Sequence, residues 1–208
     1  MFITFEGIEG SGKTTQIKLL IPLLKARGYD YLLTREPGAT QIGREIRAIL
    51  LDAAHSEMLP LTELLLYEAD RAQHAHEVIK PALMANKVVI SDRFFDATTV
   101  YQGYGRGCDI GFIQQIHRLV LGGLEPDLTL ILDLPVNLGL ERAWQRINTR
   151  TEGLPEDRFE KEALDFHEKI RHGYLTLAEE ERARFRVIDA SRDEQSVHKD
   201  IAEIVLNL

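Results

Sequence analysis

An eight-residue segment close to the N-terminus constrains the fold most strongly. Gly7–Thr14, with the sequence GIEGSGKT, matches the pattern G-x-x-x-x-G-K-[ST] at every fixed position. An apolar run precedes it and an amphipathic helical pattern follows, which is the context that the motif requires. Glycines let backbone N–H groups turn toward an anion, and the start of a helix adds partial positive charge. The segment therefore predicts a nucleoside triphosphate site, without saying how the γ-phosphate is used.

Two residues at the end of the segment have specific expected roles. Lys13 is expected to reach the β- and γ-phosphates, and the Thr14 hydroxyl is expected to bind Mg²⁺. The alternative is a glycine-rich turn that contains Gly-Lys-Thr by chance, which the flanking patterns disfavour. The expected nucleotide-binding residues of this segment are Gly7, Gly10, Ser11, Gly12, Lys13, Thr14 and Thr15.

Apolar runs alternate with helical patterns along the chain. The runs are continuous in apolar residues, which is typical of strands buried on both faces of a parallel sheet. This order predicts one α/β domain, residues 1–208, in which helices flank a five-stranded parallel sheet. The predicted strands are Phe2–Glu6, Tyr31–Thr34, Lys87–Ser91, Leu128–Asp133 and Phe185–Asp189. The predicted helices are Lys13–Arg27, Gln41–Leu51, Leu61–Met84 with a break allowed near Pro81, Ile110–Gly122, Val136–Asn148, Phe159–Arg182 and Asp193–Val205.

Composition restricts the partners and the compartment. The 208 residues include 44% hydrophobic residues and carry a net charge of −8, which weighs against a protein that coats nucleic acid. A local cluster of Arg and Lys can still bind a small anion. The single cysteine, Cys108, excludes an internal disulfide framework, and no apolar run reaches the roughly 18 residues of a membrane span. The N-terminus also lacks signal-peptide features, so we expect a cytoplasmic protein without a membrane partner.

A charged pair follows the third predicted strand. Asp92 and Arg93 come at its carboxyl end, where open α/β sheets bind their ligands. Asp92 is expected to hold Mg²⁺ or its water shell, and the Arg93 guanidinium suits a phosphate. An acid for Mg²⁺ followed directly by arginine fits a kinase with an anionic acceptor better than a motor ATPase. The alternative is an ordinary surface ion pair.

Three segments together resemble the thymidylate kinase family. They are Gly7–Thr14, the run Thr34–Gly38 (TREPG) and the stretch Val89–Gln102 (VISDRFFDATTVYQ), and the resemblance covers essentially the whole chain. It implies a P-loop nucleoside-monophosphate-kinase fold with a mobile lid at roughly 142–160. It also implies ATP and dTMP as substrates, Mg²⁺ as cofactor, dTDP as product and a homodimer.

The resemblance assigns the acceptor site residue by residue. Tyr67 and Arg71 lie four residues apart on one helix face; Tyr67 would stack on thymine and Arg71 would bond the base edge. The alternative from sequence alone is a core tyrosine with a surface arginine. The further implied contacts are Glu9 and Tyr101 at the sugar, Arg93 and Arg47 at the phosphate, Pro37 at the thymine methyl, and Glu36, Thr98 and Gln102 around the base. The chain departs from the family at Ala97, where serine is usual, and mildly at Tyr67, where phenylalanine is more frequent.

Arginines spaced four residues apart mark the predicted lid. Arg142, Arg146 and Arg150 could line one face of a helix, although the charged interval Gln145–Glu162 could also be a solvated loop. No arginine lies within the phosphate loop, so by resemblance the chain is of the lid-arginine kind. Arg146 or Arg150 would then approach the γ-phosphate as a catalytic residue beside Lys13 and Arg93, and Arg142 would pack against adenine. Glu160 would help to order the metal site or the lid.

Two other functions stay open at this point. One is a different nucleoside or nucleoside-monophosphate kinase, which the TREPG run and Tyr67 with Arg71 disfavour. The other is a GTP-binding switch, which would normally show Asn-Lys-x-Asp where this chain has Leu132–Pro135. The seven histidines show no metal-ligand spacing and are interpreted as structural or exposed, with His74 the only one near the proposed pocket.

Overall fold

The computed structural model describes residues 1–149 and 158–208, and its centre is a parallel β-sheet. Its strands are β1 (Phe2–Glu6), β2 (Tyr31–Arg35), β3 (Val88–Asp92), β4 (Leu128–Asp133) and β5 (Phe185–Asp189). They follow the order β2-β3-β1-β4-β5, and every neighbouring pair is parallel. The predicted five-stranded parallel sheet is confirmed, with strand bounds within one residue of the prediction.

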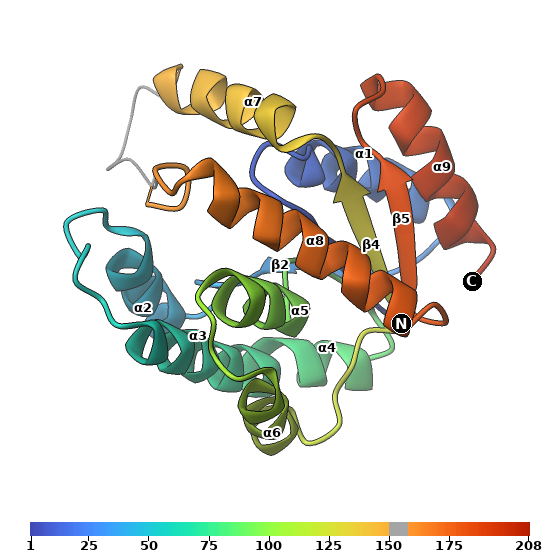
Figure 1. Cartoon of the computed structure of the whole chain (residues 1–208). Helices are drawn as coiled ribbons and strands as arrows, with labels where there is room; N and C mark the ends of the chain where they lie inside the picture. Colours follow the sequence, from blue (N-terminus) through green and yellow to red (C-terminus); the bar gives the residue numbers. More distant parts are fainter. Residues whose placement is uncertain (150–157) are drawn as a thin grey trace.

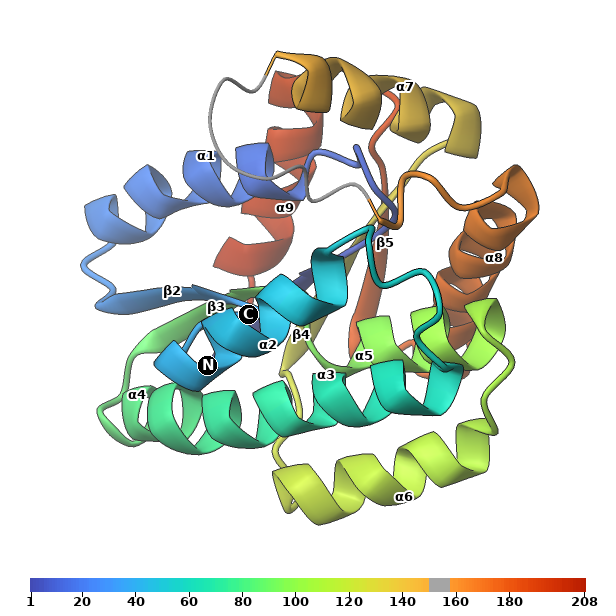
Figure 2. The ribbon, with the colours of Figure 1, turned by 90° about the vertical axis from the view of Figure 1, so that its left-hand side faces the viewer.

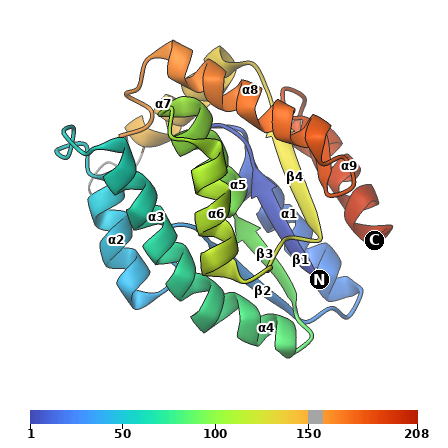
Figure 3. The same cartoon turned by 60° about the horizontal axis from the view of Figure 1, so that its bottom comes forward.

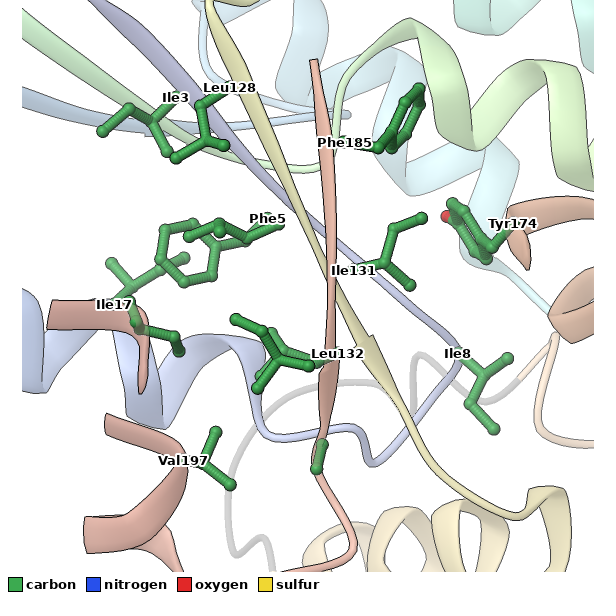
Figure 4. Close-up of a cluster of buried hydrophobic side chains, with 14 of the residues drawn as sticks. Ile3, Phe5, Ile8, Ile17, Leu128, Ile131, Leu132, Tyr174, Phe185 and Val197 are labelled. Carbon is green, nitrogen blue, oxygen red and sulfur yellow. The ribbon is translucent and has the colours of Figure 1, made fainter. Parts of the chain in front are cut away.

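Helices cover both faces of the sheet, as the continuous apolar strands require (Figures 1 and 2). Helices α1 and α9 pack side by side on one face, and the opposite face carries α3 to α6 and α8. Figure 4 shows Phe5 and Ile17 on one side of the strands and Tyr174 on the other. The helices of the described residues are α1 (Lys13–Ala26), α2 (Gln41–Leu51), α3 (Pro60–His74), α4 (Lys80–Met84), α5 (Phe95–Thr98), α6 (Ile110–Leu121), α7 (Val136–Asn148), α8 (Leu164–Glu180) and α9 (Glu194–Leu206), with π-helical segments η1 (Ala75–Ile79) and η2 (Thr99–Gly105).

The predicted helix Leu61–Met84 is a continuous helical segment with a π-helical section inside it. It runs through α3, η1 and α4, and the wide π turns of η1 come just before Pro81. Proline has no N–H to donate to the preceding turn, so a local change of helical hydrogen bonding is expected there. The expected break near Pro81 is therefore a change of helix type.

Two other segments differ from the prediction. The helix predicted at Phe159–Arg182 begins at Leu164, because Phe159 is buried in the core and Arg158 is tied to distant groups. The second segment, α5 with η2, is helical although no helix was predicted there. Its β-branched and aromatic residues favour strands, and packing between α3 and α8 overrides that preference (Figure 3).

Candidate active site

The phosphate loop joins the end of β1 to the start of α1. Gly10 has φ 70°, and a Cβ there would lie 1.9 Å from the Gly139 carbonyl oxygen of α7. Gly12, the residue before α1, has φ 90°. Side chains other than hydrogen would strain both positions, so the loop can take this path only with glycine there.

Lys13 is folded back over its own loop. Its Nζ donates to the carbonyl oxygens of Gly7 at 2.9 Å and Ile8 at 3.0 Å, and to the Ser11 hydroxyl at 3.1 Å. Burial, and secondly the positive charge of Arg93, lower the pKa of Lys13 to about 8. The ammonium is therefore a buried cation whose hydrogen-bond acceptors, among residues 1–149 and 158–208, are neutral.

Thr14 and Asp92 meet beside the loop. Thr14 Oγ1 donates to Asp92 Oδ2 at 3.2 Å, because β1 and β3 are neighbours and both end at this edge of the sheet. Among residues 1–149 and 158–208, no group of three or more His, Cys, Asp or Glu residues could hold a metal by itself. One hydroxyl and one carboxylate suit Mg²⁺, which usually keeps several waters and takes its other oxygens from substrate phosphates.

Arg93 is surrounded by acids and tyrosines at the centre of the cleft. Its guanidinium donates to Glu9 Oε1 at 3.1 Å and to the Tyr174 hydroxyl at 3.0 Å, and it lies 4.8 Å from the ring centroid of Tyr101. The φ of 69° at Arg93 is unusual for a residue with a side chain, and such strain is found mainly at functional sites. Burial raises the pKa of Glu6, 4.0 Å from Arg93, to about 7 although Arg93 opposes this.

Glu9 behaves in the opposite way to Glu6. Burial alone would raise its pKa, but the nearby His167 ring, the charge of Arg93 and a hydrogen bond from Tyr101 lower it to about 2. The Tyr101 hydroxyl donates to Glu9 Oε1 at 2.5 Å. Glu9 is therefore a carboxylate throughout the neutral pH range.

His167 corrects the interpretation of the histidines. It is fully buried on α8, and its Nδ1 lies 3.4 Å from Glu9 Oε2. His74, which was expected to be the only histidine near the pocket, contacts Thr34 and the cleft residue Glu36, so both it and His167 lie beside the cleft and neither lines it. Sequence reasoning missed His167 because it is far from Glu9 along the chain and no local motif marks it.

Tyr67 and Arg71 lie on the face of α3 that lines the cleft. Arg71 is only 1% exposed, so the interpretation as a surface arginine is wrong. Its Nε donates to Glu36 Oε2 at 2.9 Å, its Nη1 pairs with Glu68, and its Nη2 donates to Thr98 Oγ1 at 2.9 Å. Burial would lower the pKa of Arg71, but the charges of Glu36 and Glu68 outweigh it and raise the pKa. Arg71 is thus held in one position from three sides.

The TREPG run supplies part of that support. Glu36 Oε1 is 2.8 Å from His74 Nδ1, and the other ring nitrogen of His74 is 2.6 Å from Thr34 Oγ1. Asp70 Oδ1 accepts from the Gly38 N–H at 3.0 Å, and burial, followed by the charge of Glu36, raises the pKa of Asp70 to about 6. These contacts attach the end of β2 to α3.

Arginines of α2 and α7 line the two ends of the cleft. Arg47 donates to the Pro37 carbonyl at 2.9 Å, and Arg142 donates to the Ala190 carbonyl at 3.0 Å. Arg146 is 3.3 Å from Glu160 Oε1, and its side chain is 63% exposed. Arg150 lies outside the described residues.

One continuous cleft of about 1520 Å³ connects these groups. It reaches from the phosphate loop to Tyr67 and Arg71 and includes Ala97. Gly7, the first residue of the phosphate loop, does not line the cleft. The predicted site residues that line the cleft are Glu9, Gly10, Ser11, Gly12, Lys13, Thr14, Thr15, Glu36, Pro37, Arg47, Tyr67, Arg71, Asp92, Arg93, Thr98, Tyr101, Gln102, Arg142 and Arg146.

Known proteins show which family shares this fold and sequence. No helix in the described part of the chain is long and apolar enough to cross a membrane. Residues 5–201 match the family model described as thymidylate kinase. The chain is 58% identical over 188 residues to thymidylate kinase from Geotalea daltonii, covering 90% of this chain and 88% of that protein. It is 54% identical over 197 residues to thymidylate kinase from Desulfovibrio desulfuricans, covering 95% and 91%.

A solved structure gives the same result. The crystal structure of thymidylate kinase from Ehrlichia chaffeensis matches with a TM-score of 0.77 and 36% identity, covering 99% of this chain and 98% of that chain. The resemblance seen in the sequence motifs is confirmed by family model, relatives and fold together. The chain belongs to the thymidylate kinase family.

Proposed function

We propose that this chain transfers the γ-phosphoryl group of ATP to dTMP and releases dTDP and ADP. The observation that carries the proposal is the single cleft that joins a phosphate loop to a pocket lined by Tyr67 and Arg71. A nucleoside triphosphate and a pyrimidine monophosphate can therefore be held with their phosphates facing each other. Membership of the thymidylate kinase family supports the same pair of substrates.

The donor phosphates bind at the loop. Backbone N–H groups and the N-terminus of α1 attract the phosphate oxygens, with Ser11, Thr14 and Thr15 beside them. Lys13 exchanges its neutral acceptors for charged phosphate oxygens, which bind an ammonium more strongly. Arg142, next to Ala190, packs against the adenine ring.

Thr14 and Asp92 are the residues of this chain that would hold Mg²⁺. When bound there, the ion would supply positive charge that neutralises phosphate oxygens. Asp92 orients the Thr14 hydroxyl, because a carboxylate can only accept its hydrogen bond.

The acceptor nucleotide binds at the other end of the cleft. Tyr67 stacks on the thymine, and Arg71 donates to the base edge. Arg93 and Arg47 hold the 5′-phosphate. The remaining contacts are Pro37 at the methyl group, Glu36, Thr98 and Gln102 around the base, and Tyr101 and Glu9 at the deoxyribose.

Catalysis rests on placing cations around the transferred group. Lys13 and Arg93 flank it, and an arginine of the predicted lid, Arg146 or Arg150, completes the set. These cations stabilise charge that builds up in the transition state, so direct in-line transfer needs no covalent intermediate on the protein.

The test is a substrate panel with ATP and Mg²⁺. The enzyme is expected to convert dTMP fastest, dUMP more slowly, and dCMP, dGMP and dAMP little, as measured by ADP release and by separation of the products. Equal rates with all five nucleotides would favour the broader nucleoside-monophosphate kinase, and ATP hydrolysis indifferent to dTMP would overturn the proposal.

The chain is also proposed to act as a homodimer in the cytoplasm. Leu61 and Leu65 are about half exposed on α3, at 51% and 50%, and a second copy could cover them. Sedimentation analysis of the purified chain measures this directly. A monomer at micromolar concentration would contradict the dimer without affecting the proposed reaction.

A further inference from the structure

Two side-chain bridges connect α3 to the α5–η2 segment around the base pocket. Glu63, Tyr67 and Arg71 are spaced four residues apart on α3, so they follow one face of the helix. Facing them, Gln102 Nε2 donates to Glu63 Oε1 at 2.7 Å, and Arg71 Nη2 donates to Thr98 Oγ1 at 2.9 Å. Tyr67 therefore lies between the two bridges along α3.

Glu63 decides which way the Gln102 amide points. A carboxylate only accepts hydrogen bonds, so the amide must turn its NH₂ group toward Glu63. Glu63 is 0% exposed and forms ion pairs with Arg158 at 2.6 Å and Arg106 at 3.3 Å. The orientation of the amide therefore follows from the chemistry of the two partners as well as from the 2.7 Å contact.

The other end of the amide is turned away from Glu63, in a residue that is 1% exposed. Gln102 lines the cleft, and its Oε1 accepts no hydrogen bond from the described residues. This oxygen is not among the unpartnered atoms that are sealed from solvent. Glu63 holds the nitrogen end of the amide through one of its two N–H groups, so Gln102 directs its Oε1 acceptor toward a bound base, while Arg71 on the other bridge can present only donors.

This pattern matches one class of pyrimidine. Thymine and uracil carry an N3–H donor beside an O4 acceptor, whereas cytosine carries an N3 acceptor beside an N4 donor. A buried polar group that meets the wrong partner is left unpaired, which is costly. We propose that Glu63, which does not line the cleft, is a positioning residue that makes the pocket reject cytosine by holding the Gln102 amide oxygen toward the base.

The proposal rests on the proposed function, and the test separates the two. Glu63→Gln replaces an obligate acceptor with an amide that can also donate, so the Gln102 amide is free to turn over. The kcat/KM ratio of dTMP to dCMP is expected to fall at least about tenfold. The ratio of dTMP to dUMP should stay within about twofold, since both bases carry N3–H.

Selectivity ratios are a suitable readout because both substrates are measured on the same sample. A partly unfolded variant loses activity toward both, and the ratio is unaffected. Arg106→Gln is the matched control, because it disturbs the same buried cluster and leaves the Glu63 carboxylate facing Gln102. Its dTMP to dCMP ratio should match the unmodified enzyme. If Glu63→Gln does not fold, Glu63→Asp keeps the charge, withdraws the carboxylate from Gln102, and should lower the ratio in the same direction.

A double-variant cycle tests whether Glu63 acts through Gln102. In a Gln102→Leu background, adding Glu63→Gln should change the dTMP to dCMP ratio less than about twofold. An unchanged ratio in folded Glu63→Gln, or an equal fall in Arg106→Gln, would overturn the positioning role. Failure of the unmodified enzyme to phosphorylate dTMP would overturn the proposed function instead.

Discussion

The two ends of the cleft are built in different ways. At the phosphate loop, the groups around the donor site come mostly from one continuous segment, Gly7–Thr14. The base pocket draws on the end of β2, on α3 and on the α5–η2 segment, joined by contacts such as those of Arg71 with Glu36 and Thr98. The first region is therefore local in sequence, and the second exists only after distant elements have packed.

The difference extends to how each region holds its cation. Burial depresses the pKa of Lys13, so the fold holds this charge without a full electrostatic partner. Arg71 is buried more deeply, at 1% exposure against 8% for Lys13, yet the charges of Glu36 and Glu68 outweigh the effect of burial and raise its pKa. We infer that Lys13 serves the ligand alone, whereas Arg71 serves both the ligand and the fold.

The largest expected effect comes from removing the loop cation. Lys13→Met should lower kcat for dTMP about 100- to 1000-fold, because a cation aimed at the transferred phosphoryl group is lost. Thermal unfolding should show no loss of stability near pH 7, since a buried, poorly paired charge has been replaced by an apolar side chain. Lys25→Met, at the exposed far end of the same helix, is the control and should leave kcat unchanged. A marked destabilisation of Lys13→Met would remove the contrast with Arg71.

Arg71→Gln should have a smaller effect on the reaction and a larger one on the fold. The KM for dTMP is expected to rise about 10- to 100-fold, the range for losing a hydrogen bond from a charged donor. The unfolding free energy in urea should fall by about 3 kcal/mol, because two buried carboxylates lose the guanidinium that pairs with both of them. The exposed Arg118→Gln on α6 controls for the loss of one arginine. A raised KM with unchanged stability would mean that Arg71 serves substrate alone.

The smallest expected effect is a pH-dependent gain in stability from Asp70→Asn. The pKa of Asp70 is raised from near 3.8 to about 6, so the folded chain keeps a proton that the unfolded chain releases. The contribution of this bound proton to the stability of the fold is complete below about pH 4 and is lost as the pH rises through about 6. Asparagine does not titrate and can still accept from the Gly38 N–H.

The free energy of unfolding of Asp70→Asn should therefore exceed that of the unmodified chain by about 1 to 2 kcal/mol at pH 8 and by much less at pH 4. Denaturant unfolding at both pH values measures the difference. Asp165→Asn, at an exposed residue, should show no such trend. A gain of equal size at both pH values would rule out the titration of Asp70 as its source.

Prediction from sequence succeeded where the signal is local. The strands could be located because residues buried on both faces leave continuous apolar runs, as in β1 and β4. The loop could be recognised because Gly7, Gly12 and Lys13 occupy the fixed positions of a motif only eight residues long. One further local signal could have placed Glu63 on the pocket face of the helix. Glu63 precedes Tyr67 by four residues, the same step that separates Tyr67 from Arg71.

Prediction failed where the determining contact crosses the fold. His167 contacts Glu9 only because the fold brings α8 next to the phosphate loop. No sequence motif near either residue predicts this contact. The helical state of α5 with η2 contradicts the preference of Thr98, Thr99 and Val100 for strands. The start of α8 was misplaced because Arg158 is held by Glu63 and by the Leu50 carbonyl.

By itself, the sequence determined the five strands and most of the helices, the phosphate loop and the family, because these depend on periodicity and on short local motifs. Only the tertiary structure decided that Arg71 is buried, that Glu9 keeps its charge and that Gln102 turns its amide nitrogen to Glu63. These three properties depend on desolvation and on hydrogen-bond partners from other elements, and such partners are set when the elements pack together.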